Sequence, residues 1–272
     1  MTYETVTYAV ERGVGVLTLN RPDALNAMNH KMVEEIVAIQ KLAVEDNAVN
    51  ALLVQGAGRA FSAGFDLKES DASSGERTLL GTKEMLKADF DMIMGFWHCP
   101  KPTVAAVQGY CLAGACELAL ACDMTVASAD ARFGEPEVRF GAGIVVMLMP
   151  WMTGPKQAKE LLLTGRDRVT AERALAMGLI NEVVPEGQAQ AEGLKLAREL
   201  AILDPHAVRM TKEAINRTYE NMGMTEALQT ALDIDLVLTS LDTPDRRKFR
   251  EVSKKDGLKA ALAWRESRFV DD

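Results

Sequence analysis

Histidine is scarce in this sequence, and the few histidines are scattered along the chain. They are His30, His98 and His206. None of them stands with a cysteine or a carboxylate at the spacing that metal ligands require. The sequence therefore indicates no metal site.

Cysteine is also scarce, and no two cysteines have the CxxC spacing of redox and zinc motifs. The four cysteines are Cys99, Cys111, Cys116 and Cys122. Three of them lie in or beside one apolar segment, which is typical of buried, unreactive thiols in a reducing compartment. We therefore expect no disulfide and a cytoplasmic protein.

The chain lacks an excess of positive charge, a long apolar run and a leader-like start. It has 31 basic and 39 acidic residues, a net charge of −8 and a pI near 5.1, which argues against a nucleic-acid partner. The longest strongly apolar stretch, residues 143–152, is too short to span a bilayer. Residues 1–10 have no basic start before an apolar stretch, which argues against a secretory signal.

What remains is the composition of an ordinary globular protein. Its 272 residues are enough for one large domain, or for a domain with a small appendage. Short apolar strands are expected at residues 6–10, 14–19, 51–55, 103–107, 124–127 and 181–184. Helices are expected between them, and helices alone from about residue 187, with breaks near residues 204–205, 223 and 243–244. This alternation predicts an α/β fold with a helical C-terminal part.

Several helices have recognisable caps or faces. Asn29 is expected to cap a helix whose apolar face is formed by Met32, Ile36, Ile39 and Ala43. Thr170 is expected to cap a helix over residues 170–177 that Gly178 ends, and another helix is expected over residues 156–163. Residues 69–81 are polar and expected to be mobile. They precede a methionine-rich helix, residues 83–97, that is expected mainly to fill the core.

Residues 101–123, KPTVAAVQGYCLAGACELALACD, stand out because they place one carboxylate in an apolar helix. Glu117 lies among apolar residues, where a carboxylate is costly unless it has a partner or a function. It follows Gly114 by about one helical turn, and a helix N-terminus offers unpaired N–H groups and positive potential. The stretch predicts an N–H donor aimed at developing negative charge, with a carboxyl group beside it.

This stretch resembles the signature of the crotonase family, the enoyl-CoA hydratases and isomerases, which runs KPxIAAVxGxxxGGGxELAxxCD. The resemblance continues in GRAFSAGFDLKE, FGEPEVRFG and LLLTGRDRVTAERALAMGLINEVVP and covers nearly the whole chain. It implies a ββα spiral core over residues 1–200 and a C-terminal helical region over residues 201–272 that makes trimer contacts. A homotrimer or a dimer of trimers is the implied assembly.

The resemblance also implies the site residues. Phe65 and Gly114 would donate two backbone N–H groups to an enolate oxygen, and Glu137, in F-G-x-P-E, would join Glu117 as the second catalytic carboxyl. Glu135 takes the variable position and is expected to be structural or exposed. The residues implied in binding coenzyme A are Ala24, Leu25, Ala63, Phe65, Asp66, Leu67, Lys68 and Gly114. Coenzyme A would be part of an acyl-CoA substrate, so no separate cofactor is implied.

Three functions fit these residues. Glutamate at both positions favours a hydratase, because in isomerases of the family the position matching Glu117 is often apolar. An isomerase or another acyl-CoA reaction, such as hydrolysis or dehydration, is the alternative, and a non-catalytic acyl-CoA binder needs neither acid. Residues 141–154, GAGIVVMLMPWMTG, depart from the family's P-G-x-G-G-T-Q-R-L pattern, which leaves the acyl group open. Phe65 stands where alanine is frequent and is expected to reshape the pocket entrance.

Overall fold

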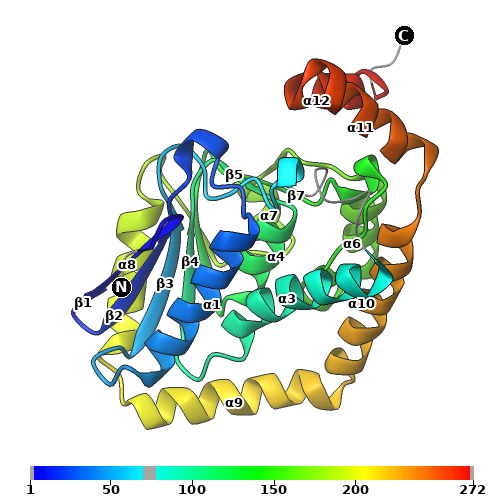
Figure 1. Cartoon of the computed structure of the whole chain (residues 1–272). Coiled ribbons are helices and arrows are strands. Elements are labelled where there is room, and N and C mark those ends of the chain that lie inside the picture. The colour runs from blue at the N-terminus through cyan, green and yellow to red at the C-terminus, as the bar shows by residue number, and fades with distance from the viewer. Residues whose placement is uncertain (1–2, 70–77, 270–272) are drawn as a thin grey trace.

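A six-stranded sheet forms the centre of the computed structural model, which describes residues 3–69 and 78–269 (Figure 1). Its strands, in spatial order, are β1 (Val6–Glu11), β2 (Val14–Leu19), β3 (Ala51–Gly56), β4 (Thr103–Val107), β6 (Met124–Ser128) and β9 (Glu182–Val184). β1 and β2 form the expected antiparallel hairpin, and every other neighbouring pair is parallel. Parallel strands need crossover connections, and these carry the functional segments.

The two faces of this sheet pack against different helices. Alternate residues of a strand point to opposite faces, so Leu52 and Val54 enter the main core while Ala51 and Leu53 face the other way. α1 (His30–Glu45) packs on the first face, and α8 (Ala189–Ala201) covers the second. Asn29 caps α1 as expected, by accepting a hydrogen bond from the Met32 N–H at 3.0 Å.

A second, smaller sheet was not expected from the sequence. It consists of β5 (Tyr110–Leu112), β7 (Arg132–Gly134) and β8 (Val169–Thr170). Residues 131–141, where no strand was predicted, contain β7 and a 3₁₀ turn, η2 (Glu137–Phe140). Strands of two or three residues are too short to show an alternating pattern, and distant pairing partners stabilise them.

Five further helices surround the two sheets within the described residues. They are α3 (Leu79–Trp97), α4 (Gly114–Ala121), α5 (Met149–Met152), α6 (Pro155–Thr164) and α7 (Ala171–Ala176). α3 begins four residues before the expected start, because Thr78 caps it by accepting a hydrogen bond from the Gly81 N–H at 3.1 Å. Its Met92, Met94 and Phe96 are buried, as expected for core filling. Most of the polar segment predicted to be mobile, residues 70–77, lies outside the described residues.

Four helices complete the chain beyond α8: α9 (Pro205–Asn221), α10 (Met224–Ser240), α11 (Pro244–Asp256) and α12 (Leu258–Ser267). They begin after the breaks predicted from the sequence, with one further break at Gly257, whose φ is 87°. α9 runs along one end of the core, and α10 packs on α3 (Figure 1). α11 and α12 follow α10 and lie farther from the central sheet. None of the helices within the described residues has the length and apolarity needed to cross a membrane.

Candidate active site

Glu117 is placed by α4, a short helix whose eight residues are all buried. The chain enters this helix from β5 through Ala113, whose N–H donates to the Gly134 carbonyl at 2.8 Å and so joins the ends of β5 and β7. The Glu117 side chain is only 1% exposed. Neither of its carboxyl oxygens has a hydrogen-bond partner among the described residues. An unpartnered buried carboxyl is costly to the fold, which makes it a candidate for function.

Glu135 and Glu137 come from the segment that follows β7. At Gly134 a side chain would lie 2.3 Å from the Arg166 carbonyl oxygen, so the segment passes close to the residues before β8. Glu135 is 1% exposed, and Glu137 is half-buried. Of the two alternatives expected for Glu135, structural or exposed, burial excludes the exposed one. An irregular segment beside a proline has no periodicity from which the direction of a side chain could be predicted.

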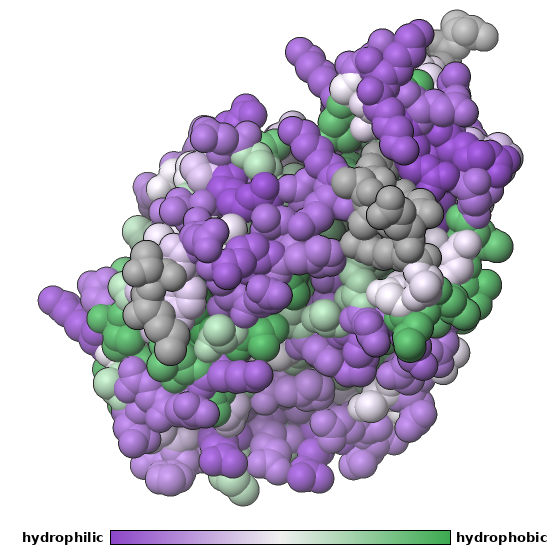
Figure 2. Space-filling view, viewed as in Figure 1, coloured by the Kyte–Doolittle hydropathy of each residue, from purple (hydrophilic) through white to green (hydrophobic). Residues whose placement is uncertain are grey.

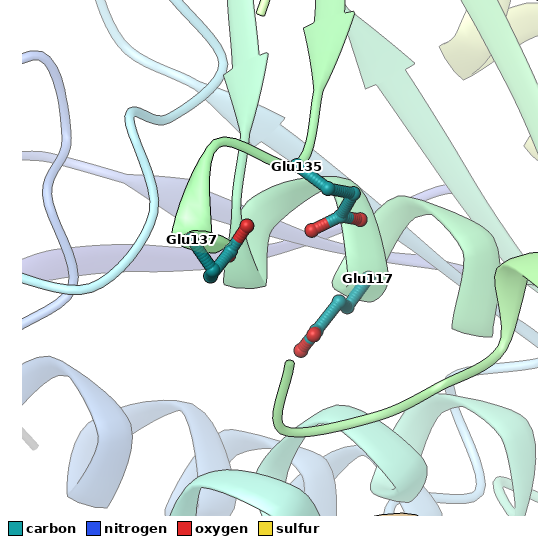
Figure 3. A group of neighbouring side chains, drawn as sticks. All are labelled: Glu117, Glu135 and Glu137. Atoms are coloured by element: carbon teal, nitrogen blue, oxygen red, sulfur yellow. The ribbon is translucent and has the colours of Figure 1, made fainter. Parts of the chain in front are cut away.

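The three carboxyl groups converge on one space (Figure 3). One carboxylate oxygen from each of Glu117, Glu135 and Glu137 lies within 4.8 Å of the other two. Two unit charges about 4 Å apart repel by about 4 kcal/mol at an effective dielectric constant near 20. Three ionised carboxylates are therefore not stable together here, and protons or a cation must offset the charge.

Burial decides how this site titrates. Burial raises the pKa of Glu117 well above its usual range, and the neighbouring Glu137 raises it further. The pKa of Glu135 is raised in the same way, by burial first and then by Glu137 and Glu117. Burial also raises the pKa of Glu137, to about 8, while its own backbone N–H and the neighbouring Glu135 carboxyl act in the opposite direction. Raised pKa values favour bound protons, so the cluster holds protons near neutral pH.

Two backbone N–H groups belong to residues at the start of α4 and packed against that start, one helical turn before Glu117. Gly114 is the first residue of α4, and Phe65 pairs with Met28 in an isolated parallel bridge. No described residue accepts a hydrogen bond from the N–H of Phe65 or of Gly114. A side chain at Gly114 would lie 2.3 Å from Cε2 of the Phe65 ring, so the two residues are in contact. The structure thus brings together the two residues predicted to be donors.

The backbone before α4 is strained. Ala113 has a φ of 55° and a ψ of −138°, a region that favours glycine. Gly64, the residue before Phe65, lies against Ala113, because a side chain at Gly64 would lie 2.6 Å from the Ala113 Cβ. Strain of this kind is typical of functional sites, and here it sets the direction of the Gly114 N–H.

The residues predicted to bind coenzyme A form two adjoining turns. η1 (Pro22–Ala24) leads into Leu25, whose carbonyl accepts a hydrogen bond from the Ala63 N–H at 3.0 Å. Asp66 holds the turns together, since Arg21 Nη1 lies 2.8 Å from its Oδ2 and the Lys68 N–H donates to its Oδ1 at 3.0 Å. Lys68 is exposed, and Leu67 is half-buried. The Asp66 side chain therefore supports the loop.

Sequence reasoning missed Asn26, which organises these turns. Asn26 is fully buried, and its φ of 54° lies in the left-handed region that asparagine tolerates. Its Oδ1 accepts the Arg21 N–H at 2.9 Å. Its Nδ2 donates to the carbonyls of Ala57, Ala60 and Phe61. An asparagine inside a tight turn was the available signal.

Sequence reasoning also missed Asp235, which reaches the site from α10. It is 3% exposed, and a side chain at Gly143 would lie 2.2 Å from its Oδ1. Gly143 belongs to the apolar segment that departs from the family pattern. In the same segment, the Val146 N–H faces Glu117 and opposes the rise of its pKa, although it forms no hydrogen bond with either carboxyl oxygen. The unusual segment therefore borders the site.

Comparison with known proteins gives one consistent result. The family described as enoyl-CoA hydratase/isomerase matches residues 9–260. A probable enoyl-CoA hydratase of Rhizobium meliloti is 34% identical over 288 aligned positions, which cover 99% of each chain. The crotonyl-CoA hydratase of Syntrophomonas wolfei is 34% identical over 280 positions, again covering 99% of each.

Solved structures are similar over the same length. An enoyl-CoA hydratase/isomerase from Xanthobacter autotrophicus Py2 superposes with a TM-score of 0.97 at 51% identity, over 99% of this chain and 100% of that one. An enoyl-CoA hydratase from Mycobacterium smegmatis gives a TM-score of 0.89 at 28% identity, over 97% and 94%. The similarity includes the C-terminal helices as well as the sheets.

Proposed function

Because this chain belongs to the enoyl-CoA hydratase/isomerase family, we propose that it is an enoyl-CoA hydratase, which adds water across the double bond of a 2-enoyl-CoA thioester. The observation that carries the proposal is the site itself. Two carboxyl groups, on Glu117 and Glu137, face one space beside two N–H groups with no partner among the described residues. An acyl-CoA thioester is the substrate class of the family.

The chemistry follows from these four groups. The thioester oxygen accepts hydrogen bonds from the Phe65 and Gly114 N–H groups, which stabilise the enolate; one such donor typically contributes about 3–4 kcal/mol. A water held between Glu117 and Glu137 adds its oxygen to the β-carbon. The ionised carboxyl takes the proton of that water, and the protonated carboxyl gives one to the α-carbon, so that one water is added in total. Both carboxyls lie on one side of the substrate, which makes the addition syn.

Replacement of each glutamate tests this proposal. Glu117→Gln and Glu137→Gln should each lower hydration by about 10²–10⁴-fold, the usual contribution of a general acid or base. The measurements are the loss of conjugated-thioester absorbance and a mass gain of one water, across a panel of 2-enoyl-CoA substrates. Near-normal hydration by Glu117→Gln beside an inactive Glu137→Gln would instead indicate a one-carboxylate isomerase.

The two adjoining turns are the proposed site for the coenzyme A moiety. The turn with Ala24 and Leu25 contacts the loop at Ala63, and residues 65–68 continue from it toward Gly114. Free coenzyme A should slow hydrogen exchange in residues 63–68 and give a calorimetric binding signal. Absence of both effects would count against this assignment.

We propose a homotrimer, or a dimer of trimers, in the cytoplasm. The support for assembly is a set of exposed apolar side chains on or beside α9 and α10: Met210, Ile215, Met222, Ile234, Val237 and Leu241. Apolar residues lie along the α10 edge of the surface in Figure 2. The support for a reducing compartment is that all four cysteines are free and buried.

A further inference from the structure

Glu135 has no part in the hydration described above, yet its carboxyl lies in the same space as the two glutamates that do. We propose that Glu135 is a positioning residue for the reaction: as a carboxylic acid, it donates its O–H to the Glu137 carboxylate and holds that carboxylate toward the substrate. This inference rests on the proposed function, because it gives Glu135 a role that acts through Glu137.

Besides the thiol of Cys116, the geometry leaves the Glu135 carboxyl little else to bind. Glu135 is 1% exposed, and its Oε2 has no hydrogen-bond partner among the described residues. The Oε2 of Glu137 also lacks a hydrogen-bond partner among the residues that the structure describes. The two residues flank Pro136, and their carboxyl groups point into the same space (Figure 3). A carboxylic O–H on Glu135 and a carboxylate on Glu137 would satisfy each other.

The groups that face Glu135 are acids and thiols. α4 contributes Glu117 and Cys116, β5 contributes Cys111, and η2 contributes Glu137. Two acids outside the cluster also raise pKa values within it: Asp235 of α10 and Asp89 of α3. Within the described residues, the groups that shift the pKa values of the three glutamates most are acids, a thiol and backbone N–H groups, and none is a cation. A proton on Glu135 is therefore the simplest way to offset negative charge on Glu137.

The consequence is that the three acids have different roles in the reaction. Burial and its acidic neighbours raise the pKa of Glu135 and favour its protonated form, and burial also raises the pKa of Glu137, to about 8. In the proposed arrangement Glu137 carries the negative charge, and the Glu135 O–H stabilises it. Without that donor, the carboxylate of Glu137 becomes harder to form and is free to rotate.

The test compares two replacements of Glu135 in the full-length protein. Glu135→Gln keeps an N–H donor but cannot titrate, whereas Glu135→Met keeps the size and removes the donor. We expect the acid limb of the pH profile of kcat to move up by about one pH unit in Glu135→Met, because hydrogen bonding to the charged form lowers a carboxyl pKa. Near neutral pH this lowers kcat by about tenfold, and higher pH restores it. In Glu135→Gln the acid limb stays close to that of the wild type.

Exposed Glu34 on α1 supplies the matched control, since Glu34→Met makes the same chemical change away from the site and should not move the profile. Equal behaviour of Glu135→Gln and Glu135→Met, or an unmoved acid limb in Glu135→Met, would overturn the inference. Both results would mean that the hydrogen-bond donor of residue 135 has no role.

A second readout needs no turnover. Carbon-13 NMR of protein labelled at glutamate carboxyls follows the titration of Glu137, identified by its loss in Glu137→Gln. The midpoint of the Glu137 titration should rise in Glu135→Met and stay unchanged in Glu135→Gln. An unchanged midpoint in Glu135→Met overturns the inference.

If the wild type hydrates no 2-enoyl-CoA, the proposed function fails, while this titration still decides the role of Glu135. If Glu135→Met does not fold, infrared spectroscopy of Glu135→Gln decides: the protonated-carboxyl absorbance near neutral pH should be weaker than in the wild type, and an equal absorbance would overturn the inference.

Discussion

Gly114 has no room for a side chain, because the ring of Phe65 lies over its α-carbon. A Cβ there would lie 2.3 Å from Phe65 Cε2, well inside contact distance. Both residues offer the N–H groups proposed to bind the enolate oxygen. The bulky residue at position 65 therefore constrains the residue that carries the second donor.

Gly114→Ala should consequently lower kcat by about 10²–10³-fold, the effect of misplacing one oxyanion donor. If the cause is steric, removal of the ring should relieve it. The double variant Gly114→Ala with Phe65→Ala is expected to recover at least about tenfold of the lost rate. Steady-state kinetics on one 2-enoyl-CoA decides this, and full activity of the single variant would contradict the prediction.

The buried acids also make stability depend on pH. The pKa of Glu137 is raised by burial to about 8, whereas an unfolded glutamate titrates near about 4.3. Between these values the folded protein holds a proton that the unfolded chain has released, so the stabilising contribution is complete below the unfolded pKa. It is lost as pH rises through the folded pKa.

Glu137→Gln removes this titration. Relative to the wild type, its melting temperature should therefore be higher at about pH 9 than at about pH 5, by several degrees. Differential scanning calorimetry at both pH values measures the difference. A constant offset between the two proteins would show that Glu137 titrates alike in the folded and unfolded states.

At the scale of elements, the site depends on a contact between α10 and the apolar segment before α5. Gly143 packs against Asp235 of α10, and the Oδ1 of Asp235 also accepts a hydrogen bond from Thr239 at 2.9 Å. Val146, three residues further along, faces Glu117. A C-terminal helix is thereby linked to the wall of the site.

Gly143→Ala should disturb this wall, because its Cβ would lie 2.2 Å from the Asp235 Oδ1. Overpacking typically costs about 1–3 kcal/mol, which corresponds to a melting temperature lower by several degrees, and kcat/KM should fall with it. Gly154→Ala is the matched control, because the nearest atom to its Cβ is 3.8 Å away. Equal effects of the two substitutions would argue against the contact.

At the scale of the whole molecule, the C-terminal helices leave apolar side chains uncovered. Ile234 and Val237 of α10 are 65% and 62% exposed and lie three residues apart, on one face of the helix. Such a surface is expected to pack against another copy of the chain in the proposed trimer.

Replacement of both by glutamate should therefore shift the protein toward monomers in sedimentation velocity, because each buried charge would lack a partner. Leu163→Glu provides the control, since Leu163 is 71% exposed on α6 and lies outside this surface. A wild type that sediments as a monomer at micromolar concentration would contradict the proposed assembly. An unchanged assembly in the double variant would exclude this face of α10 as the contact.

The sequence by itself determined the long elements and half of the site. The hairpin, α1 with its Asn29 cap and the buried strand β4 follow from local periodicity and capping, which depend on neighbouring residues alone. Glu117 could be singled out because a carboxylate in an apolar helix violates that periodicity. Glu137 could be placed only through the resemblance of its motif to a family.

Tertiary structure alone decided the rest. β5 and β8 exist because distant segments pair with them. Glu135 and Asp235 join the site because chain segments about 100 residues apart converge there, as Gly143 and Asp235 do. The direction in which a side chain points from an irregular segment depends on what packs around that segment, and that information is not local in the chain.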